Sequence, residues 1–391
     1  MGFFKGFTQV LRRELRRMRD FPVYTTLSLI LPVVSFAYFA VLLSDGIPRQ
    51  IPVAVLDLDG TPLSRQLTRM IDATATCDVR YQLTDMDEGE RMMREGRISA
   101  IVRIPSRFEA DIFSNRQTNI VAYINGLNIS ANGLLNRDIQ TTVTTFSSGI
   151  QIQMLEKKGM SKLQAYSQMM PIAFDRHILF NPYTNYAYYL LPSFLPMMLM
   201  IFSLLITVFA IGTELKYGTA GEWFATADGS SWAALLGKLL PYSLIMILMS
   251  LTMNTLMYKY LGVPLNGSPG LLILAGILFV LSYQAIGVLM ITVFSNLRLS
   301  LSIGGGYSVL AFTFSGLTFP MMAMSGYMRA LCFIFPFTFY TEVFIDQAMR
   351  GAPVHYSLPH LGYMTLFILL PLLCLPRLKK ISTNEHYWRR M

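Results

Sequence analysis

The sequence predicts a polytopic α-helical membrane protein with six transmembrane helices, an N-terminal amphipathic interfacial helix, and an α/β extracytoplasmic domain between helices 1 and 2. Two observations predict this class. Charged residues make up only 14% of the 391 residues and hydrophobic residues 53%, whereas soluble domains carry roughly 25% charged residues. Long apolar runs also recur, and at about 1.5 Å per residue each can cross a hydrocarbon core of about 30 Å.

The first predicted span is residues 22–44, around a charge-free run from Val23 to Leu43. The run contains Pro32, which a spanning helix tolerates because neighbouring groups satisfy the freed backbone oxygen. A basic start followed by an apolar run is also typical of a secretory signal. This run is long for a signal and no clear small-residue cleavage pattern follows it, so we expect an uncleaved anchor.

Residues 1–21 predict an amphipathic helix on the cytoplasmic membrane surface, in contact with membrane lipids. Apolar side chains recur every three or four residues, and basic side chains occupy the other positions. The apolar stripe consists of Phe4, Phe7, Leu11, Leu15 and Met18. A solvated helix is the alternative, but a Phe-rich stripe directly before a span favours the interfacial position.

Five further apolar runs predict a transmembrane region over residues 187–378. They are Tyr188–Ile211, Leu239–Leu261, Leu271–Phe294, Leu299–Phe319 and Leu361–Leu375. Basic residues gather in alternate short connections and in the tail, residues 379–391. The positive-inside rule therefore predicts that both chain ends are cytoplasmic.

Residues 321–359 are hydrophobic but interrupted by Pro336, Gly351, Pro353 and Pro359, and they carry charges. Two additional spans are one interpretation of this segment. Breaks and charges are costly against lipid and tolerable where protein encloses them. We therefore expect a re-entrant segment of short helices on the outer side.

Residues 45–186 differ in composition and predict the extracytoplasmic α/β domain. Short runs rich in β-branched residues predict strands at 51–57, 98–104 and 119–124, and the stretches between them predict helices. A small sheet follows from this alternation. Ser130 to Lys158 predicts a long helix that forms a stalk together with the approach to the second span.

The run Val55 to Thr61, VLDLDGT, resembles the nucleophile motif of haloacid-dehalogenase-type phosphatases. Those enzymes use one aspartate to attack phosphate and a second to move a proton, with magnesium bound to the oxygens. They also need a lysine and an acidic pair further along a cytosolic core. In a small outer domain, we favour a strand that ends at Asp57 and a turn at Asp59 and Gly60.

Composition and motifs also exclude several function classes. The net charge of +9 comes from basic residues beside the spans, and no nucleic-acid motif accompanies it, so we expect contact with anionic lipid and not nucleic acid. Three scattered cysteines and four dispersed histidines give neither a disulfide pattern nor a metal site. The dipeptide Gly237-Lys238 is followed by Leu239, and no phosphate-binding loop occurs in the sequence, so we expect no nucleotide hydrolysis by this chain.

The predicted cytoplasmic loop, residues 212–238, carries an ordered series of residues. In order, they are Glu214, Lys216, Gly218, Thr219, Glu222, Gly237 and Lys238, followed by Pro241. This series resembles the membrane subunits of ABC-2-type exporters, in the branch with a large domain between spans one and two. One departure is that Ala220 and Gly221 separate Gly218-Thr219 from Glu222, where one residue is common.

The resemblance extends over nearly the whole chain. Further matching features are the basic amphipathic start, the opening IPVAVLDLD of the outer domain, Asn181-Pro182 with Pro192, Phe319-Pro320, and Phe335-Pro336. The resemblance implies a permease that works with a separate ABC ATPase, and this partner binds ATP and Mg while the chain itself binds no cofactor. It also implies a second copy or a paralogous permease, a periplasmic adaptor as an additional partner, and the inner membrane of a bacterial cell.

Two sets of residues are candidates for function. The resemblance implies that Glu214, Lys216, Gly218, Thr219, Glu222, Trp223 and Phe224 couple the chain to the ATPase. A charged residue beside two aromatic ones suits an anchor at a protein interface. Asn254, Gln284 and Gly305 are candidates for the translocation path, since polar and small residues at membrane depth line routes or join helices.

Two other functions remain open at this point. An ion-coupled transporter needs ionisable residues buried at mid-membrane, and the predicted spans do not supply them. A membrane-anchored receptor or structural protein, whose outer domain binds a partner without transport, fits the same pattern of spans.

Overall fold

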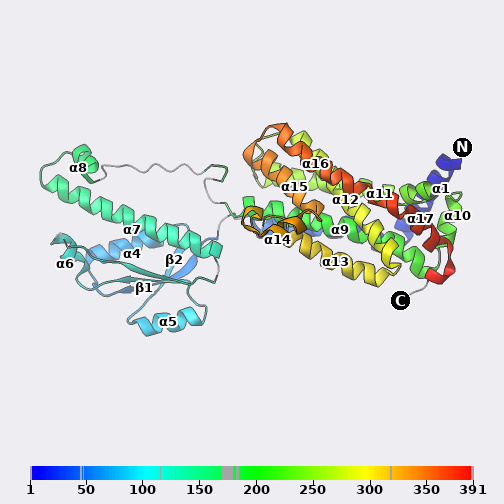
Figure 1. The fold of residues 1–391 in the computed structure, drawn as a ribbon. Helices are drawn as coiled ribbons and strands as arrows, with labels where there is room; N and C mark the ends of the chain where they lie inside the picture. The colour runs from blue at the N-terminus through cyan, green and yellow to red at the C-terminus, as the bar shows by residue number, and fades with distance from the viewer. Residues whose placement is uncertain are drawn as a thin grey trace. The chain divides into compact units, whose positions relative to one another are not determined.

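The computed structural model describes residues 2–44, 46, 48–114, 116–127, 129–169, 179–181, 185–317 and 319–388. The chain divides into two compact units (Figure 1). One, the helical unit, comprises residues 1–46 and 179–391, and the other, the inserted domain, comprises residues 47–178. The domain predicted from the sequence, residues 45–186, extends beyond the inserted domain at both ends.

The helical unit begins with α1, Gly2–Asp20, and a first span made of α2, Pro22–Thr25, the π-helical turn η1, Thr26–Ile30, and α3, Leu31–Leu42. Its other long elements are α9, Ala187–Tyr217; α11, Ser231–Thr255, continued by the π-helical turn η2, Leu256–Tyr260; α12, Pro269–Phe294; α13, Leu297–Thr313; α16, Val354–Ile368; and α17, Leu370–Thr383. The short elements are α10, Ala220–Thr226; η3, Met321–Ala323; α14, Gly326–Cys332; α15, Pro336–Phe344; the π-helical turn η4, Ile345–Arg350; and η5, Glu385–Tyr387.

Among the described residues, five helical stretches are long and apolar enough to cross a membrane. They are Pro22–Leu42, Ala187–Tyr217, Ser231–Tyr260, Pro269–Phe294 and Val354–Thr383. A bent pair, α14 with α15–η4, makes a sixth if it is counted as one span. The chain is therefore a polytopic helical membrane protein, and the predicted fold class is confirmed.

Two predicted spans have different limits in the structure. The run Leu299–Phe319 does not form one helix: α13 ends at Thr313 after 17 residues, about 25 Å, and Gly316 then adopts a positive φ of 86°. The last span is longer than the predicted Leu361–Leu375, since α16 begins at Val354 and α17 continues to Thr383. Pro371 stands at the start of α17, where its missing N–H is tolerated.

The predicted re-entrant segment contains two helices joined at a bend of 89°, a geometry of either a broken span or a re-entrant loop. Nearly every side chain of α15 is buried. The Gln347 side chain donates to the Ser357 hydroxyl at 2.9 Å and accepts from the Ser268 N–H at 3.1 Å. Protein groups thus satisfy the polar atoms of the Gln347 side chain, as burial at membrane depth requires.

Small residues allow the helices of this unit to approach closely. A Cβ at Gly287 of α12 would lie 3.1 Å from the Leu204 carbonyl oxygen of α9. On α1, a Cβ at Gly6 would lie 2.6 Å from the Ala227 carbonyl oxygen, and one at Gly237 of α11 would lie 2.8 Å from the Phe7 carbonyl oxygen. These positions set α1 directly against α11 and against the end of α10.

The inserted domain contains a four-stranded mixed sheet in the order β2-β1-β3-β4. The strands are β1, Ile51–Asp57; β2, Cys77–Gln82; β3, Ala100–Ile104; and β4, Val121–Ile124. The helices are α4, Pro62–Asp72; α5, Met86–Arg94; α6, Phe108–Phe113; α7, Ile129–Lys157; and α8, Lys162–Met169. β1 pairs in parallel with β2 and β3, and β4 is antiparallel to β3. The predicted small α/β sheet is confirmed, and β2 is an additional strand.

Side chains alternate across the sheet and form two cores. Val53 and Val55 of β1 pack with α4 and α7, whereas Ala54 and Leu56 pack on the other face with α5 (Figure 1). α7 contributes Leu135, Ile139 and Phe146 to the first core. This helix is therefore a layer of the domain.

Replacement of Gly6 by Ala is expected to destabilise the helical unit by about 1–3 kcal/mol, because the new methyl group meets backbone and not a movable side chain. Gly305→Ala is the matched control, since open space surrounds that position and Ala favours a helix over Gly by about 0.5–1 kcal/mol. Chemical denaturation of both variants in one detergent measures the difference. Equal losses of stability would show that α1 is not closely packed.

Candidate functional site

Charged side chains are buried where α1, α9 and α11 meet. This group, the ionic cluster, consists of Arg13, Glu14, Arg17, Glu214 and Lys238. The side chains of Glu14, Glu214 and Lys238 have no solvent exposure. Acidic and basic side chains are almost never fully buried unless they are paired, so the partners within the cluster decide whether these three helices can pack.

Lys238 connects the two buried carboxylates. Its Nζ donates to Glu14 Oε2 at 2.6 Å and to Glu214 Oε1 at 2.8 Å. Arg13 donates through both Nη atoms to the two oxygens of Glu214, at 2.6 and 3.0 Å, which is the bidentate geometry of a strong pair. Arg17 also donates to Glu214. Through these bonds α1 is tied to both α9 and α11.

Hydroxyl groups complete the cluster. They belong to Tyr24, Thr213, Thr219 and Tyr242. Tyr242 donates to Glu14 Oε1 at 2.6 Å, and Thr219 donates to Glu214. Each buried carboxylate thus accepts from a cation and from a hydroxyl, which offsets part of its lost hydration.

The cluster contains three cationic and two anionic side chains. Burial lowers the pKa of the Arg13 guanidinium, and the nearby Glu14 and Glu222 carboxylates oppose that effect. Because an arginine stays protonated in proteins, the positive charge of Arg13 persists and needs its carboxylate partner.

The predicted loop 212–238 is mostly helical. α9 continues to Tyr217, six residues past the predicted end at Ile211, and α11 begins at Ser231. Gly218 ends α9 in the left-handed conformation, with φ 73°, a conformation glycine adopts without strain. α10 lies between these helices in the chain, so most of the segment that the sequence predicted as a loop is helical.

Trp223 and Phe224 of α10 have a different position from the one we expected. Their side chains are 0% and 2% exposed. The Trp223 indole N–H donates to the Ala234 carbonyl oxygen at 3.1 Å, and the Lys238 ammonium lies 5.1 Å from the ring centroid. The Trp223 side chain therefore holds α10 against α11 and the ionic cluster, and the Phe224 ring packs against it, with ring centroids 4.9 Å apart.

An exposed face remains on the same segment. Lys216 and Tyr217 at the end of α9, and Glu222 and Ala225 on α10, are exposed. Trp388, near the end of the sequence, lies beside Gly221 of α10, since a Cβ at Gly221 would be 2.9 Å from its ring. Of the residues predicted to couple, Glu214 is interior, Gly218 and Thr219 are partly buried, and Lys216 and Glu222 face outward.

The three candidates for the translocation path are not one site. Asn254 is buried on α11, and neither atom of its amide has a partner among the described residues. Gln284 is buried on α12, and its Oε1 accepts from the Ser243 hydroxyl at 2.6 Å. Gly305 borders open space, whereas its neighbour Gly304 carries the close contact with Leu204.

Comparison with known proteins decides the family. The model of the ABC-2 family transporter proteins matches residues 24–375. The chain belongs to the ABC-2 transporter family. The Escherichia coli (strain K12) protein named probable multidrug ABC transporter permease YbhS is 23% identical over 282 residues, 72% of this chain and 70% of that protein. The inner membrane transport permease YhhJ of the same strain is 22% identical over 286 residues, 72% of each chain.

This membership makes the chain a permease of an ABC-2-type transporter. Members of the family are typically non-catalytic membrane subunits, and membership implies association with an ATPase subunit. Within the part of the permease that the structure describes, no group of three or more His, Cys, Asp or Glu side chains is placed to hold a metal ion.

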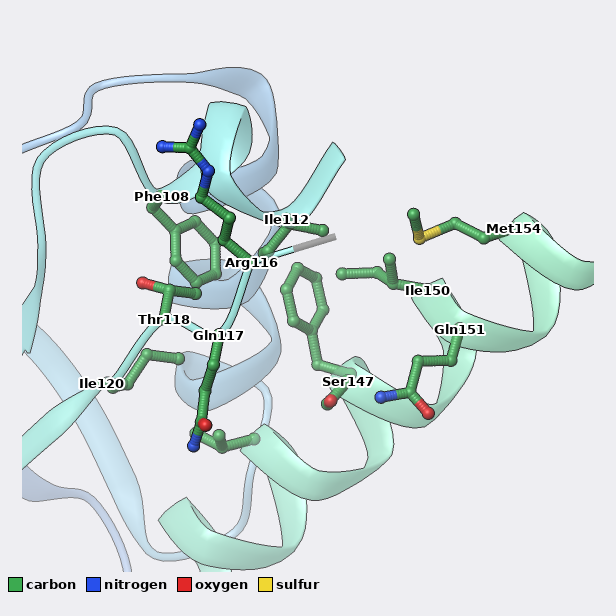
Figure 2. A pocket seen from close by; sticks show the side chains of 12 residues that line it. Phe108, Ile112, Arg116, Gln117, Thr118, Ile120, Ser147, Ile150, Gln151 and Met154 are labelled. Atoms are coloured by element: carbon green, nitrogen blue, oxygen red, sulfur yellow. The ribbon is translucent and has the colours of Figure 1, made fainter. Parts of the chain in front are cut away.

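The inserted domain of the permease has a cavity of about 310 Å³ between α6, the approach to β4, and α7 (Figure 2). Phe108 and Phe146 both line it and stack, with ring centroids 6.3 Å apart. Gln117, Thr118 and Gln151 add polar groups. A mixed lining of this kind suits a small amphiphilic ligand.

The aspartates of the VLDLDGT run have structural partners. Asp57 accepts from the N–H groups of Asp59 and Gly60, each at 3.0 Å, and from the Ser64 hydroxyl at 2.6 Å. Asp59 accepts from the Thr61 hydroxyl and from the Glu109 N–H. Burial alone would raise the pKa of Asp59, and these hydrogen bonds lower it. The run is a capped strand–helix turn, in agreement with the non-catalytic interpretation.

Sequence reasoning missed most of the ionic cluster. Glu14 is an acidic residue in the middle of a run of arginines in the predicted interfacial helix, and that exception was a usable signal. Its partner Lys238 is 224 positions away in the sequence, and no local pattern joins them. Pro182 of the quoted Asn-Pro pair, and Arg389 and Arg390 of the basic tail, lie outside the described residues.

Glu214→Gln is expected to destabilise the permease by about 3–5 kcal/mol, because Lys238 and the two arginines lose a buried partner. Glu385→Gln, at an exposed position outside the cluster, is the matched control and should change stability by less than about 0.5 kcal/mol. Denaturation midpoints in detergent compare the two. Similar small effects would mean that the cluster is solvated.

Proposed function

We propose that the chain is the membrane-spanning permease subunit of an ATP-driven exporter, and that it couples to its ATPase through the exposed face of α10 and the end of α9. The observation that carries this proposal is the ionic cluster beneath that face. A partner that pushes α10 acts on an element fixed by Trp223 and Phe224 to the helix that carries Lys238. Movement at the surface is then transmitted to α1, α9 and α11 together.

Rigid transmission is the mechanical consequence of this packing. Closely packed interfaces change between discrete arrangements and do not deform continuously. The Lys238 bridge joins α1 to α9, and Gly6 and Gly237 leave no room between α1 and its neighbours. We therefore assign Glu214 and Thr219 to the interior support of the coupling segment, and Lys216 and Glu222 to contact with the ATPase.

The assignment places this segment and both chain ends on the cytoplasmic side and the inserted domain on the outer side of a bacterial inner membrane. The positive-inside pattern supports this orientation. We assign Asn254, Gln284 and Gly305 to the membrane path or to its moving walls. A second copy or a paralogous permease completes the path, and the inserted domain passes cargo outward, with a periplasmic adaptor as a further partner.

A second candidate function is that of a membrane-anchored receptor. The cavity beside Phe108 and Phe146 favours it, since a ligand can bind there without transport. The family membership favours the exporter, because it implies an ATPase partner.

Purification of the tagged chain in mild detergent from its native cells is expected to recover an ATPase with a nucleotide-binding phosphate loop. The double variant Lys216→Glu with Ala225→Trp should reduce the recovered ATPase at least tenfold, because charge reversal and bulk at two exposed positions disrupt an interface. Mass spectrometry of the purified complex measures the ratio of the two subunits.

Glu90→Arg, an exposed substitution in the inserted domain, is the control and should leave the ATPase ratio unchanged. An ATPase that stays with the double variant would place the interface elsewhere. If no ATPase accompanies the native chain while its fold is preserved, the receptor function replaces the exporter.

A further inference from the structure

A groove on the helical unit lies outside the proposed coupling segment, and one residue of its lining, Gln284, is also assigned above to the membrane path. It has a volume of about 430 Å³ and is lined by α11, α12, α16, α17 and one residue of α1, Phe7. Most lining side chains are leucine or another apolar residue, such as Leu240 and Leu281. The groove falls within the usual size of ligand pockets, about 300–1,000 Å³.

The groove opens at the surface of the helical unit. Its rim residues Trp232, Leu236, Leu244 and Leu372 are exposed, and Leu244 is 58% exposed. The break between α16 and α17, next to Pro371, forms part of the wall. α11, α12, α16 and α17 belong to membrane-crossing stretches, so the groove opens toward the surroundings that a bilayer supplies.

A polar group in the groove lacks a partner. Gln284 is 3% exposed and lines the groove together with Ser243. The Ser243 hydroxyl donates to Gln284 Oε1, whereas Gln284 Nε2 has no hydrogen-bond partner in the part of the chain that the structure describes. The Ser243 hydroxyl lies closer to Gln284 Oε1, at 2.6 Å, than to the Leu239 carbonyl oxygen, at 3.1 Å, so the amide oxygen is the paired atom and the amide nitrogen the unpaired one. An unpaired amide in an apolar site costs free energy, about 1–3 kcal/mol, and a ligand with an acceptor oxygen would recover it.

We propose that this groove binds a lipid-like molecule drawn from the bilayer, with an acceptor oxygen inside its apolar body. Gln284 lies ten residues before Phe294, the end of α12, which is about 15 Å along the helix. The oxygen that reaches it therefore belongs to a ketone, ester or ether within the chain, and not to a charged headgroup at the membrane surface.

The dimensions favour a lipid-like occupant over a second copy of the chain. A helix with side chains is about 10–12 Å wide, so a helix from another copy would cover the opening and not enter it. A covering helix also leaves Gln284 Nε2 unpaired unless it carries a long polar side chain. A slender chain fills the apolar walls and brings its oxygen to the amide.

The test uses the full chain in phospholipid nanodiscs and a photoreactive fatty acid with an aryl ketone within its chain. The ketone oxygen serves as the acceptor, and irradiation joins the ketone carbon to a nearby C–H bond. Mass spectrometry is expected to locate saturable labelling in residues 235–247 and 281–288, which line the groove. Gln284→Leu should raise the probe concentration at half-saturation about fivefold, which corresponds to one hydrogen bond of about 1 kcal/mol.

Leu240→Trp is a second variant that fills the groove and leaves the amide intact, and it should abolish the saturable labelling. Leu248→Trp is its control, two helical turns further along α11 and outside the groove, and it should have no effect. Labelling spread evenly over all spans, labelling unaffected by Gln284→Leu and Leu240→Trp, or protection of the groove peptides by a second copy would each overturn the proposal. None of these results depends on an ATPase, so they are independent of the exporter function.

Discussion

The burial of charge between α1, α9 and α11 is the constraint on which the helical unit depends. Two carboxylates and an ammonium without solvent exposure are stable only in a fixed arrangement, since each loses hydration that its partners must replace. Apolar helices slide or rotate past one another at little cost, whereas a bridged set of charges has one register. The Lys238 bridge thus gives specificity to a bundle whose remaining contacts are largely leucine, methionine and phenylalanine.

The same constraint explains how the proposed coupling segment, which consists of the end of α9 and α10, is built. α10 is too short to be stable alone. Its buried aromatic residues attach it to the base that the ionic cluster makes rigid. The exposed residues of the segment therefore occupy fixed positions although their own helix has only seven residues. A surface that couples to a partner needs such support, because a contact that deforms when the partner binds transmits little movement.

The sequence was sufficient for the class of protein, and for the limits of the first span and of the strands at 51–57, 98–104 and 119–124 to within two residues. These features depend on local composition. β2, Cys77–Gln82, was missed because it mixes charged and apolar residues at a partly exposed position in the sheet. The burial of Trp223 and the partners of Glu14 depend on segments far apart in the sequence, and a local pattern contains no information about them.

The order of synthesis gives the apolar stripe of α1 a second significance. α1 is made before α11, and its buried acid Glu14 has only Arg17 of its own helix as a partner until Lys238 and Tyr242 have been synthesised and inserted. Until then, the helix needs another surface for its apolar side chains. Phe4 and Leu15, which are 76% and 51% exposed in the finished unit, suit a helix that rests at the lipid surface. In this order of assembly, α1 is synthesised before α11 but reaches its final packed position only after α11 is in place.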